Sequence, residues 1–208
     1  MFITFEGVDG SGKSTHLQLL SRVLQEKGYS VIETREPGGS ALGEDIRTLL
    51  QDHDMHSISE VLLFWAARYE HYHRIIYPAL CEKKVVLCDR FFDSTIAYQG
   101  VLRGVDISFL QSLRKLVLGD VEPDLTLILD ADIEDVVGRL TQSKGEKKQD
   151  AELNHFEKML LRDYANVQSC FVSIAQQNPH RCRMIAPGTV EEVHSRVVEA
   201  VEHAMSRD

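Results

Sequence analysis

Short apolar runs divide the chain at five places, and most of them are continuously apolar. Continuous runs of this length are typical of strands covered on both faces, whereas alternation with polar residues is typical of strands with one face in solvent. We therefore predict five strands, at residues 1–7, 30–34, 84–88, 125–130 and 181–186.

Longer stretches with helical spacing of apolar residues lie between the predicted strands. In the first, Leu17, Leu20 and Leu24 fall on one face, and Gly28 follows as a helix stop. A second stretch runs up to Pro78, which should end it because proline cannot continue the backbone hydrogen bonding of a helix. We predict helices at residues 13–27, 59–77, 153–177 and 189–206.

Strands that alternate with helices predict a parallel sheet with right-handed crossovers. The expected class is α/β, a doubly wound five-stranded parallel sheet in three α/β/α layers. The length of 208 residues and the 43% hydrophobic content suit one domain that spans residues 1–208.

A glycine-rich phosphate loop follows the first predicted strand. Residues 7–14 read GVDGSGKS and match the pattern G-x-x-x-x-G-K-[ST] in full, between a strand and an amphipathic helix. Backbone N–H groups would cradle phosphates, Lys13 would reach the β and γ phosphates, and the Ser14 hydroxyl would ligate Mg²⁺. The residues expected to surround ATP are Gly7, Val8, Asp9, Gly10, Ser11, Gly12, Lys13, Ser14 and Thr15.

The loop alone does not distinguish a GTPase, a motor ATPase and a small-molecule kinase. The sequence has no N-K-x-D guanine motif, and a nucleic-acid motor would usually be larger and more basic. A formal net charge of −9 argues against nucleic acid as a partner, because binding its backbone needs a basic surface. A kinase that acts on a small molecule fits best.

Cysteine spacing and the length of apolar runs give information about the cellular location of the protein. Its four cysteines form no C-x-x-C pair, so neither a zinc ribbon nor a redox dithiol is indicated. No signal-like leader begins the sequence, and no run approaches the roughly 18 apolar residues of a membrane span. We therefore expect a cytoplasmic protein without a membrane partner.

Two strands end in a carboxylate that could serve the chemistry. Asp89 follows the third predicted strand and precedes Arg90, and Asp130 ends the fourth. A carboxylate at this edge of the sheet can hold Mg²⁺ or its waters, and the guanidinium beside it can grip a phosphate. The arginine favours Asp89, and we expect Asp130 to cap the helix that follows it.

An aromatic ring and a guanidinium share one face of the second predicted helix, since Phe64 and Arg68 are four residues apart. The pair could stack a nucleobase and bond its carbonyl edge. Taken alone, it is also compatible with core packing plus a surface ion pair.

Four segments taken together carry a resemblance to a known family. The order FEGVDGSGKST, TREPGG, LLFWAAR and DRFFDSTIAYQG resembles the thymidylate kinases, a family of P-loop nucleoside monophosphate kinases. The resemblance spans most of residues 1–118 and continues more weakly to the C-terminus. It implies transfer of the γ-phosphate of ATP to dTMP with Mg²⁺, in a homodimer. The alternative is another small P-loop kinase that acts on a different nucleotide or nucleoside.

The resemblance also implies roles for individual residues. Asp9 matches the carboxylate that holds the sugar 3′-hydroxyl, Arg47 and Arg90 match arginines on the acceptor phosphate, and Glu36 supports that site. Tyr98 matches the aromatic residue against the deoxyribose, a filter against a 2′-hydroxyl. For the base, Phe64 would stack on thymine, Arg68 would donate to its carbonyl, and Ser94 and Gln99 would line the pocket. The expected catalytic residues are Lys13, Asp89 and Arg90, and the expected metal ligands are Ser14 and Asp89.

Residues 141–151 (TQSKGEKKQDA) are polar and lysine-rich, without apolar periodicity. They could form a solvated loop or a mobile lid over the phosphate site. Some relatives carry an arginine at the position of Gly10, so the resemblance implies that the lid supplies a cation here. The candidates in and beside the lid are Arg139, Lys144, Lys147 and Lys148.

Overall fold

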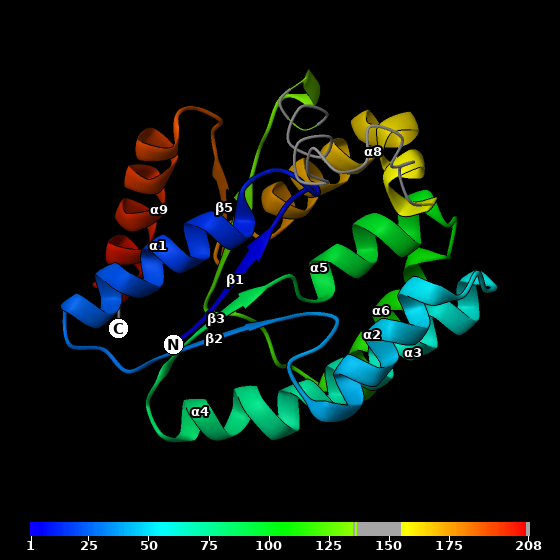
Figure 1. Ribbon diagram of the computed structural model, residues 1–208, viewed down its shortest axis with the longest axis horizontal. Coiled ribbons are helices and arrows are strands. Elements are labelled where there is room, and N and C mark those ends of the chain that lie inside the picture. The colour runs from blue at the N-terminus through cyan, green and yellow to red at the C-terminus, as the bar shows by residue number, and fades with distance from the viewer. Residues whose placement is uncertain (135, 137–154, 207–208) are drawn as a thin grey trace, which may run out of the picture.

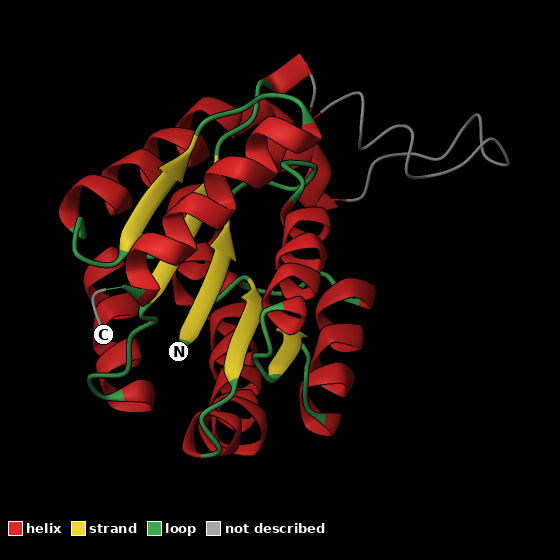
Figure 2. Ribbon diagram, turned by 90° about the vertical axis from the view of Figure 1, so that its left-hand side faces the viewer, coloured by secondary structure: helices red, strands yellow, loops and turns green. Residues whose placement is uncertain are grey.

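The computed structural model describes residues 1–134, 136 and 155–206. The predicted lid at 141–151 lies outside the described residues, and so do Arg139, Lys144, Lys147 and Lys148. The described part confirms the predicted fold class. Five parallel strands form one sheet in the order β2-β3-β1-β4-β5, with helices on both faces (Figures 1 and 2).

All five predicted strands are present, and each end lies within one residue of its predicted position. Every residue of the central strands β1 and β4 is buried, as continuous apolar runs predict. The edge strand β2 differs, because only one neighbouring strand covers it and its residues are partly or fully exposed. The strands are β1 (Phe2–Glu6), β2 (Val31–Arg35), β3 (Val85–Asp89), β4 (Leu125–Leu129) and β5 (Cys182–Ile185).

Helices are present at the four predicted places and also where none was predicted. The predicted ones correspond to α1 (Lys13–Glu26), α3 (Ser57–His71), α8 (His155–Gln177) and α9 (Val190–Met205). The others are α2 (Ala41–Asp52), α5 (Phe92–Thr95), the π-helical segment η2 (Ile96–Leu102) and α6 (Ile107–Leu118).

Two of the helices missed from the sequence begin with capping side chains that could have revealed them. Ser40 accepts a hydrogen bond from the backbone N–H of Gly43 at the start of α2, and Asp106 accepts from Ser108 and Phe109 at the start of α6. Serine and aspartate are preferred at this position because they satisfy N–H groups that the first turn leaves unpaired.

The predicted helix end at Pro78 is wrong, because the helix continues to Cys81. After α3 the chain forms the π-helical segment η1 (Tyr72–Ile76) and then α4 (Tyr77–Cys81). The N–H of Tyr77 bonds to the carbonyl of Tyr72, five residues back, and this register shift places Pro78 in the first turn of α4. Proline is tolerated there, since first-turn N–H groups have no partner within the helix.

The two faces of the sheet bury different sets of helices. Ile3 and Phe5 point from β1 toward α1 and α9, where they pack with Leu20 and Val197. Phe2, on the opposite face of β1, packs against α3 and α6. Figure 1 shows α1 and α9 together on one side of the strands. Within the described residues, every helix is too short or too polar to traverse a lipid bilayer.

Candidate active site

The phosphate loop opens at the carboxyl edge of the sheet, where the path of the chain changes direction. β1 leads to β2 on one side and β3 leads to β4 on the other, although β1 and β3 are neighbours. Phe5 pairs with Asp89 in their ladder, so the loop after β1 lies beside the end of β3. Ligands of open α/β sheets bind outside the strands at such a point.

Two glycines give the loop a backbone path that other residues would strain. Gly7 has a φ of 128°, and a Cβ at this position would lie 2.5 Å from the carbonyl oxygen of Leu129. Gly12 has a φ of 92° and forms the N-cap of α1. The loop therefore passes directly into the N-terminus of α1, whose N–H groups and dipole attract anions.

Lys13 lies beneath the loop with 6% of its surface exposed. Its Nζ donates to the carbonyl oxygens of Gly7 (3.1 Å) and Val8 (2.7 Å). Burial lowers the pKa of Lys13 to about 8, and the charge of Arg90 adds to this effect, while Asp9 opposes it. An arriving phosphate would favour the charged ammonium.

Ser14 and Asp89 place two oxygen atoms side by side at the mouth of the loop. The Ser14 hydroxyl donates to Asp89 Oδ2 at 2.5 Å, which joins the start of α1 to the end of β3. Hydroxyl and carboxylate oxygens are the ligands that Mg²⁺ prefers, and this ion usually keeps several waters and substrate oxygens as well. The described residues contain no group of three or more His, Cys, Asp or Glu side chains placed to hold a metal.

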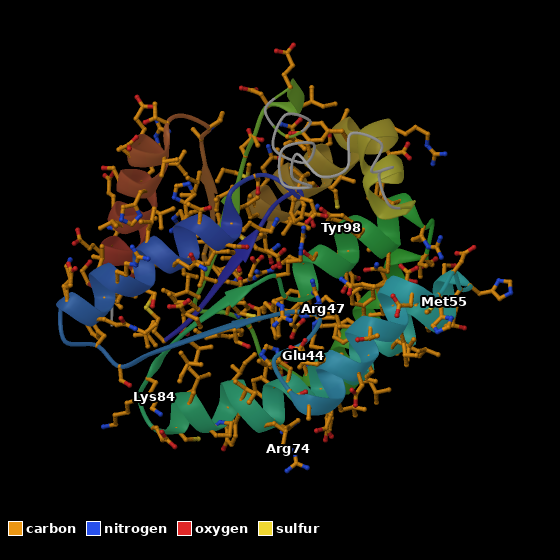
Figure 3. The ribbon with its side chains drawn as sticks, in the orientation of Figure 1. Glu44, Arg47, Met55, Arg74, Lys84 and Tyr98 are labelled. Atoms are coloured by element: carbon orange, nitrogen blue, oxygen red, sulfur yellow. The ribbon has the colours of Figure 1, made fainter. Side chains whose placement is uncertain are left out.

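A cavity of about 710 Å³ lies beside the phosphate loop, and its size suits a nucleotide. Figure 3 shows Arg47 and Tyr98 near the middle of the molecule, with Arg74 and Lys84 at its periphery. The structure brings together all the residues that were expected on the acceptor side. Lining the cavity are Asp9, Glu36, Arg47, Phe64, Arg68, Arg90, Ser94, Tyr98 and Gln99.

Arg90 connects the phosphate loop to the acceptor cavity. Its Nη1 donates to the carbonyl oxygen of Gly7 (3.1 Å) and to Ser94 Oγ (2.8 Å), and its Nη2 donates to Asp9 Oδ1 (2.6 Å) and Tyr98 Oη (3.2 Å). The guanidinium carbon also lies 4.8 Å from the centre of the Tyr98 ring, a cation–π distance. These five contacts therefore fix the orientation of the Arg90 guanidinium.

Asp9 is held ionised by its neighbours. Burial would raise the pKa of Asp9, but the charges of Arg90 and Lys13 outweigh that effect and lower the pKa to about 2. The carboxylate can therefore accept hydrogen bonds throughout the physiological range.

Arg68 is a core residue as well as a cavity residue, with 2% of its surface exposed. Its Nε donates to Glu36 Oε2 (2.6 Å), and its two other nitrogens donate to Thr95 Oγ1 (3.0 Å) and the carbonyl oxygen of Phe91 (3.1 Å). The ion pair with Glu36 is thus buried, which corrects the alternative of a surface ion pair. These bonds use three of the five N–H groups of a guanidinium.

His71 belongs to the same polar cluster, although its spacing from His73 gave no reason to expect a site. Its Nδ1 lies 3.0 Å from Glu36 Oε1, and its Nε2 lies 2.7 Å from Thr34 Oγ1. The ring is fully buried and packs so closely on Gly39 that a Cβ there would lie 2.5 Å away. His71 therefore fixes Glu36 from the side opposite Arg68.

Glu6, at the end of β1, is a further buried carboxyl that was not predicted from the sequence. Its Oε1 accepts from the N–H of Phe91 (2.7 Å) and its Oε2 accepts from Ser94 Oγ (2.5 Å). Burial raises the pKa of Glu6 to about 7, and the charge of Asp93 adds to the rise. The side chain lies on the same sheet face as Phe2, so its position in an apolar run concealed it.

The expectation that Asp130 caps the following helix is wrong. Its Oδ1 accepts from the N–H of Ala131 (3.0 Å) and from Nε2 of Gln168 on α8 (2.7 Å). The side chain instead joins the end of β4 to α8. Asp89, by contrast, lies at the loop, which supports the preference for it over Asp130.

A strand–loop–helix phosphate site that faces a nucleotide-sized cavity with several arginines defines a P-loop kinase of the nucleoside monophosphate kinase class. The sequence model of the family described as thymidylate kinase matches residues 5–197. Thymidylate kinase of Ehrlichia chaffeensis is 42% identical over 212 residues, covering 97% of this chain and 99% of that protein. The corresponding enzyme of Nitrosomonas europaea is 43% identical over 206 residues, with 97% and 92% covered.

The solved structures agree with the sequence comparison. The crystal structure of thymidylate kinase from Ehrlichia chaffeensis superposes with a TM-score of 0.78 at 42% identity, covering 97% of this chain and 98% of that one. The chain belongs to the thymidylate kinase family, a family of ATP-dependent nucleoside monophosphate kinases.

Proposed function

We propose that the protein transfers the γ-phosphate of ATP to dTMP, giving dTDP and ADP. The observation that carries this proposal is the shared wall between the phosphate loop and the cavity, where Arg90 bonds both Gly7 and Asp9. A donor phosphate in the loop and an acceptor phosphate in the cavity would therefore meet at one guanidinium.

On the donor side, loop N–H groups and Lys13 would hold the triphosphate. Ser14 and Asp89 would hold Mg²⁺, directly or through water, and when bound the ion would offset charge on the β and γ phosphates. The lowered pKa of Lys13 does not prevent this role, because the negative phosphates stabilise its charged form.

On the acceptor side, Arg47 and Arg90 would bind the phosphate of dTMP and Asp9 the 3′-hydroxyl. The base would stack on Phe64, which lines the same cavity. Arg68 would donate to a thymine carbonyl with N–H groups beyond those used by Glu36, Thr95 and Phe91. Its burial supports this role, since a rigid guanidinium loses little freedom when the base binds.

The reaction itself requires no strong general base. The attacking oxygen belongs to a phosphate that is already an anion, so it would attack the γ-phosphorus in line with the leaving ADP. Catalysis would then come from positioning and charge neutralisation by Lys13 and Arg90. A cation from residues 139–148 would complete the site.

The same proposal includes one domain over residues 1–208 with a lid at about 141–151, a cytoplasmic location and a homodimer. Support for the dimer comes from exposed apolar side chains on α3, α4 and α6. They include Leu62 (50% exposed), Tyr69 (48%), Tyr77 (52%) and Leu116 (82%). An exposed apolar surface that extends over several helices is typical of an interaction site.

An acceptor panel tests the proposed reaction. The purified protein is incubated with Mg-ATP and one acceptor at a time, and ADP release is measured for nucleoside monophosphates, nucleosides and short phosphate chains. We expect dTMP to give the highest kcat/KM. A higher value for a nucleoside or for a purine nucleotide would favour the alternative P-loop kinase.

A further inference from the structure

A buried glutamate that the preceding mechanism does not use lines the cavity beside Gln99. Glu60, on α3, has 2% of its surface exposed and lines the cavity. Its Oε1 accepts a hydrogen bond from Gln99 Nε2 at 2.9 Å, and its Oε2 lies 3.0 Å from Nη2 of Arg103. Arg103 also donates to the carbonyl oxygen of Met55 (2.6 Å).

Arg103, Glu60 and Gln99 form a chain of hydrogen-bonding groups in which each donor and each acceptor is determined. A guanidinium can only donate and an ionised carboxylate can only accept, whereas a primary amide can do either, depending on which way it is turned. Arg103 donates to Oε2 of the Glu60 carboxylate, and Oε1 of the same group accepts from the NH₂ group of Gln99. The carbonyl oxygen of Gln99 is consequently the group left to face a ligand.

We propose that Glu60 determines base specificity by holding the Gln99 amide with its carbonyl oxygen toward the base. This inference rests on the proposed function and identifies what the acceptor cavity selects. Thymine and uracil carry an N–H at position 3 that can donate to this oxygen. Cytosine has an unprotonated acceptor nitrogen at position 3, which would face another acceptor.

The size of the expected discrimination follows from the burial of the site. Gln99 has 2% of its surface exposed, so a mismatched base would leave two acceptors opposed without water between them. Sites built to bond a particular polar group reject analogues that lack it strongly, because the buried partner is left unpaired. We expect the kcat/KM for dTMP to exceed that for dCMP by at least about 100-fold.

Glu60→Gln tests the proposal because it replaces an acceptor-only group with an amide of the same shape. The donor Arg103 would take the oxygen of the new side chain, so its NH₂ group would face Gln99. Gln99 would then turn its own amide and present NH₂ to the base. The ratio of kcat/KM for dTMP over dCMP should fall at least about tenfold, with a gain for dCMP itself.

Internal controls separate this effect from a general loss of packing. The ratio for dTMP over dUMP should stay within about twofold in Glu60→Gln, since both bases have the same N–H at position 3. Glu122→Gln removes another glutamate paired with arginines, away from the cavity wall, and should leave both ratios unchanged.

Gln99→Leu provides a second route that does not depend on Glu60→Gln folding. Removing the amide should lower the dTMP over dCMP ratio by at least about tenfold, and Glu60→Gln should have no further effect on the ratio in that background. An unchanged ratio in either single variant, or an additive effect in the double variant, would overturn the proposal. A wild-type protein that turns over neither dTMP nor dUMP would instead overturn the proposed function.

Discussion

The phosphate loop and the acceptor cavity meet at Arg90 but are built in different ways. The loop is eight consecutive residues, and the groups that it offers a phosphate come from its backbone and from the N-terminus of α1. The cavity draws side chains from the loop, the connection after β2, two helices and the segment after β3. Buried ion pairs and hydrogen bonds hold those side chains, as the Arg68–Glu36 contact illustrates.

This difference separates the expected effects of mutation. A change of a loop side chain should affect chemistry with little effect on folding, because the loop backbone remains. A change of a buried cavity side chain should affect stability and substrate binding together, since the same bonds serve both. A loop variant that loses stability, or a buried cavity variant that affects only chemistry, would show that the two regions are less distinct than their structures suggest.

The largest effect on catalysis is expected for Lys13→Met. Methionine has a similar length but no charge, so the variant should fold while losing stabilisation of the transferring phosphoryl group. We expect kcat to fall by about 10²–10³-fold or more. Steady-state kinetics with ADP detection would measure the loss, and calorimetric titration should find dTMP affinity nearly unchanged. An active Lys13→Met enzyme would refute the assignment of the loop.

Arg68→Ala should affect stability and substrate binding at once. It leaves the buried Glu36 carboxylate without its main partner, which should lower the free energy of unfolding by about 3–5 kcal/mol. The KM for dTMP should rise by at least about tenfold, well beyond any change for ATP, because the proposed contact between Arg68 and the base is lost as well. Urea denaturation and initial-rate kinetics on the same preparation would measure both effects.

A matched control for Arg68 is available on the surface. Arg74 pairs with Glu70 at 3.3 Å, but its side chain is 73% exposed. Arg74→Ala should change the free energy of unfolding by no more than about 0.5 kcal/mol and leave both KM values unchanged. If Arg68→Ala raised only the KM for ATP, the assignment of Arg68 to the acceptor-base pocket would be wrong.

The lowered pKa of Lys13 predicts that ATP affinity depends on pH. Phosphates bind the ammonium form, and a group with a pKa of about 8 is largely charged at pH 7 and largely neutral at pH 9. Affinity should therefore fall about tenfold from pH 7 to pH 9, with proton uptake on binding. Calorimetry in buffers of different ionisation enthalpy measures that uptake, which Lys13→Met should abolish.

The sequence was informative wherever geometry is local. The five strands and the residues of the phosphate loop could be located because apolar runs and glycine spacing depend on neighbours in the chain. The bond between Ser14 and Asp89 was implied only indirectly, since it depends on β1 and β3 being adjacent although far apart in sequence.

Residues whose importance depends on tertiary partners escaped detection. Glu6 sits within a strand of apolar residues, and nothing local indicates that Phe91 and Ser94 will bond its carboxylate. Glu60 and His71 were missed for the same reason. Family resemblance supplied the cavity residues that are expected to contact a ligand, but not the buried groups that bond to them.

The smallest effect is expected where the two regions touch. The hydroxyl of Tyr98 accepts a hydrogen bond from Arg90 Nη2, which also donates to Asp9 of the loop, and so helps to tie the cavity to the loop. Tyr98→Phe removes that link but keeps the ring that would exclude a 2′-hydroxyl. A typical hydrogen bond contributes about 1 kcal/mol, so kcat/KM for dTMP should fall about fivefold while the preference over the ribonucleotide persists. A loss of that preference would assign the discrimination to the hydroxyl and not to the ring, and kinetics with both acceptors would decide between them.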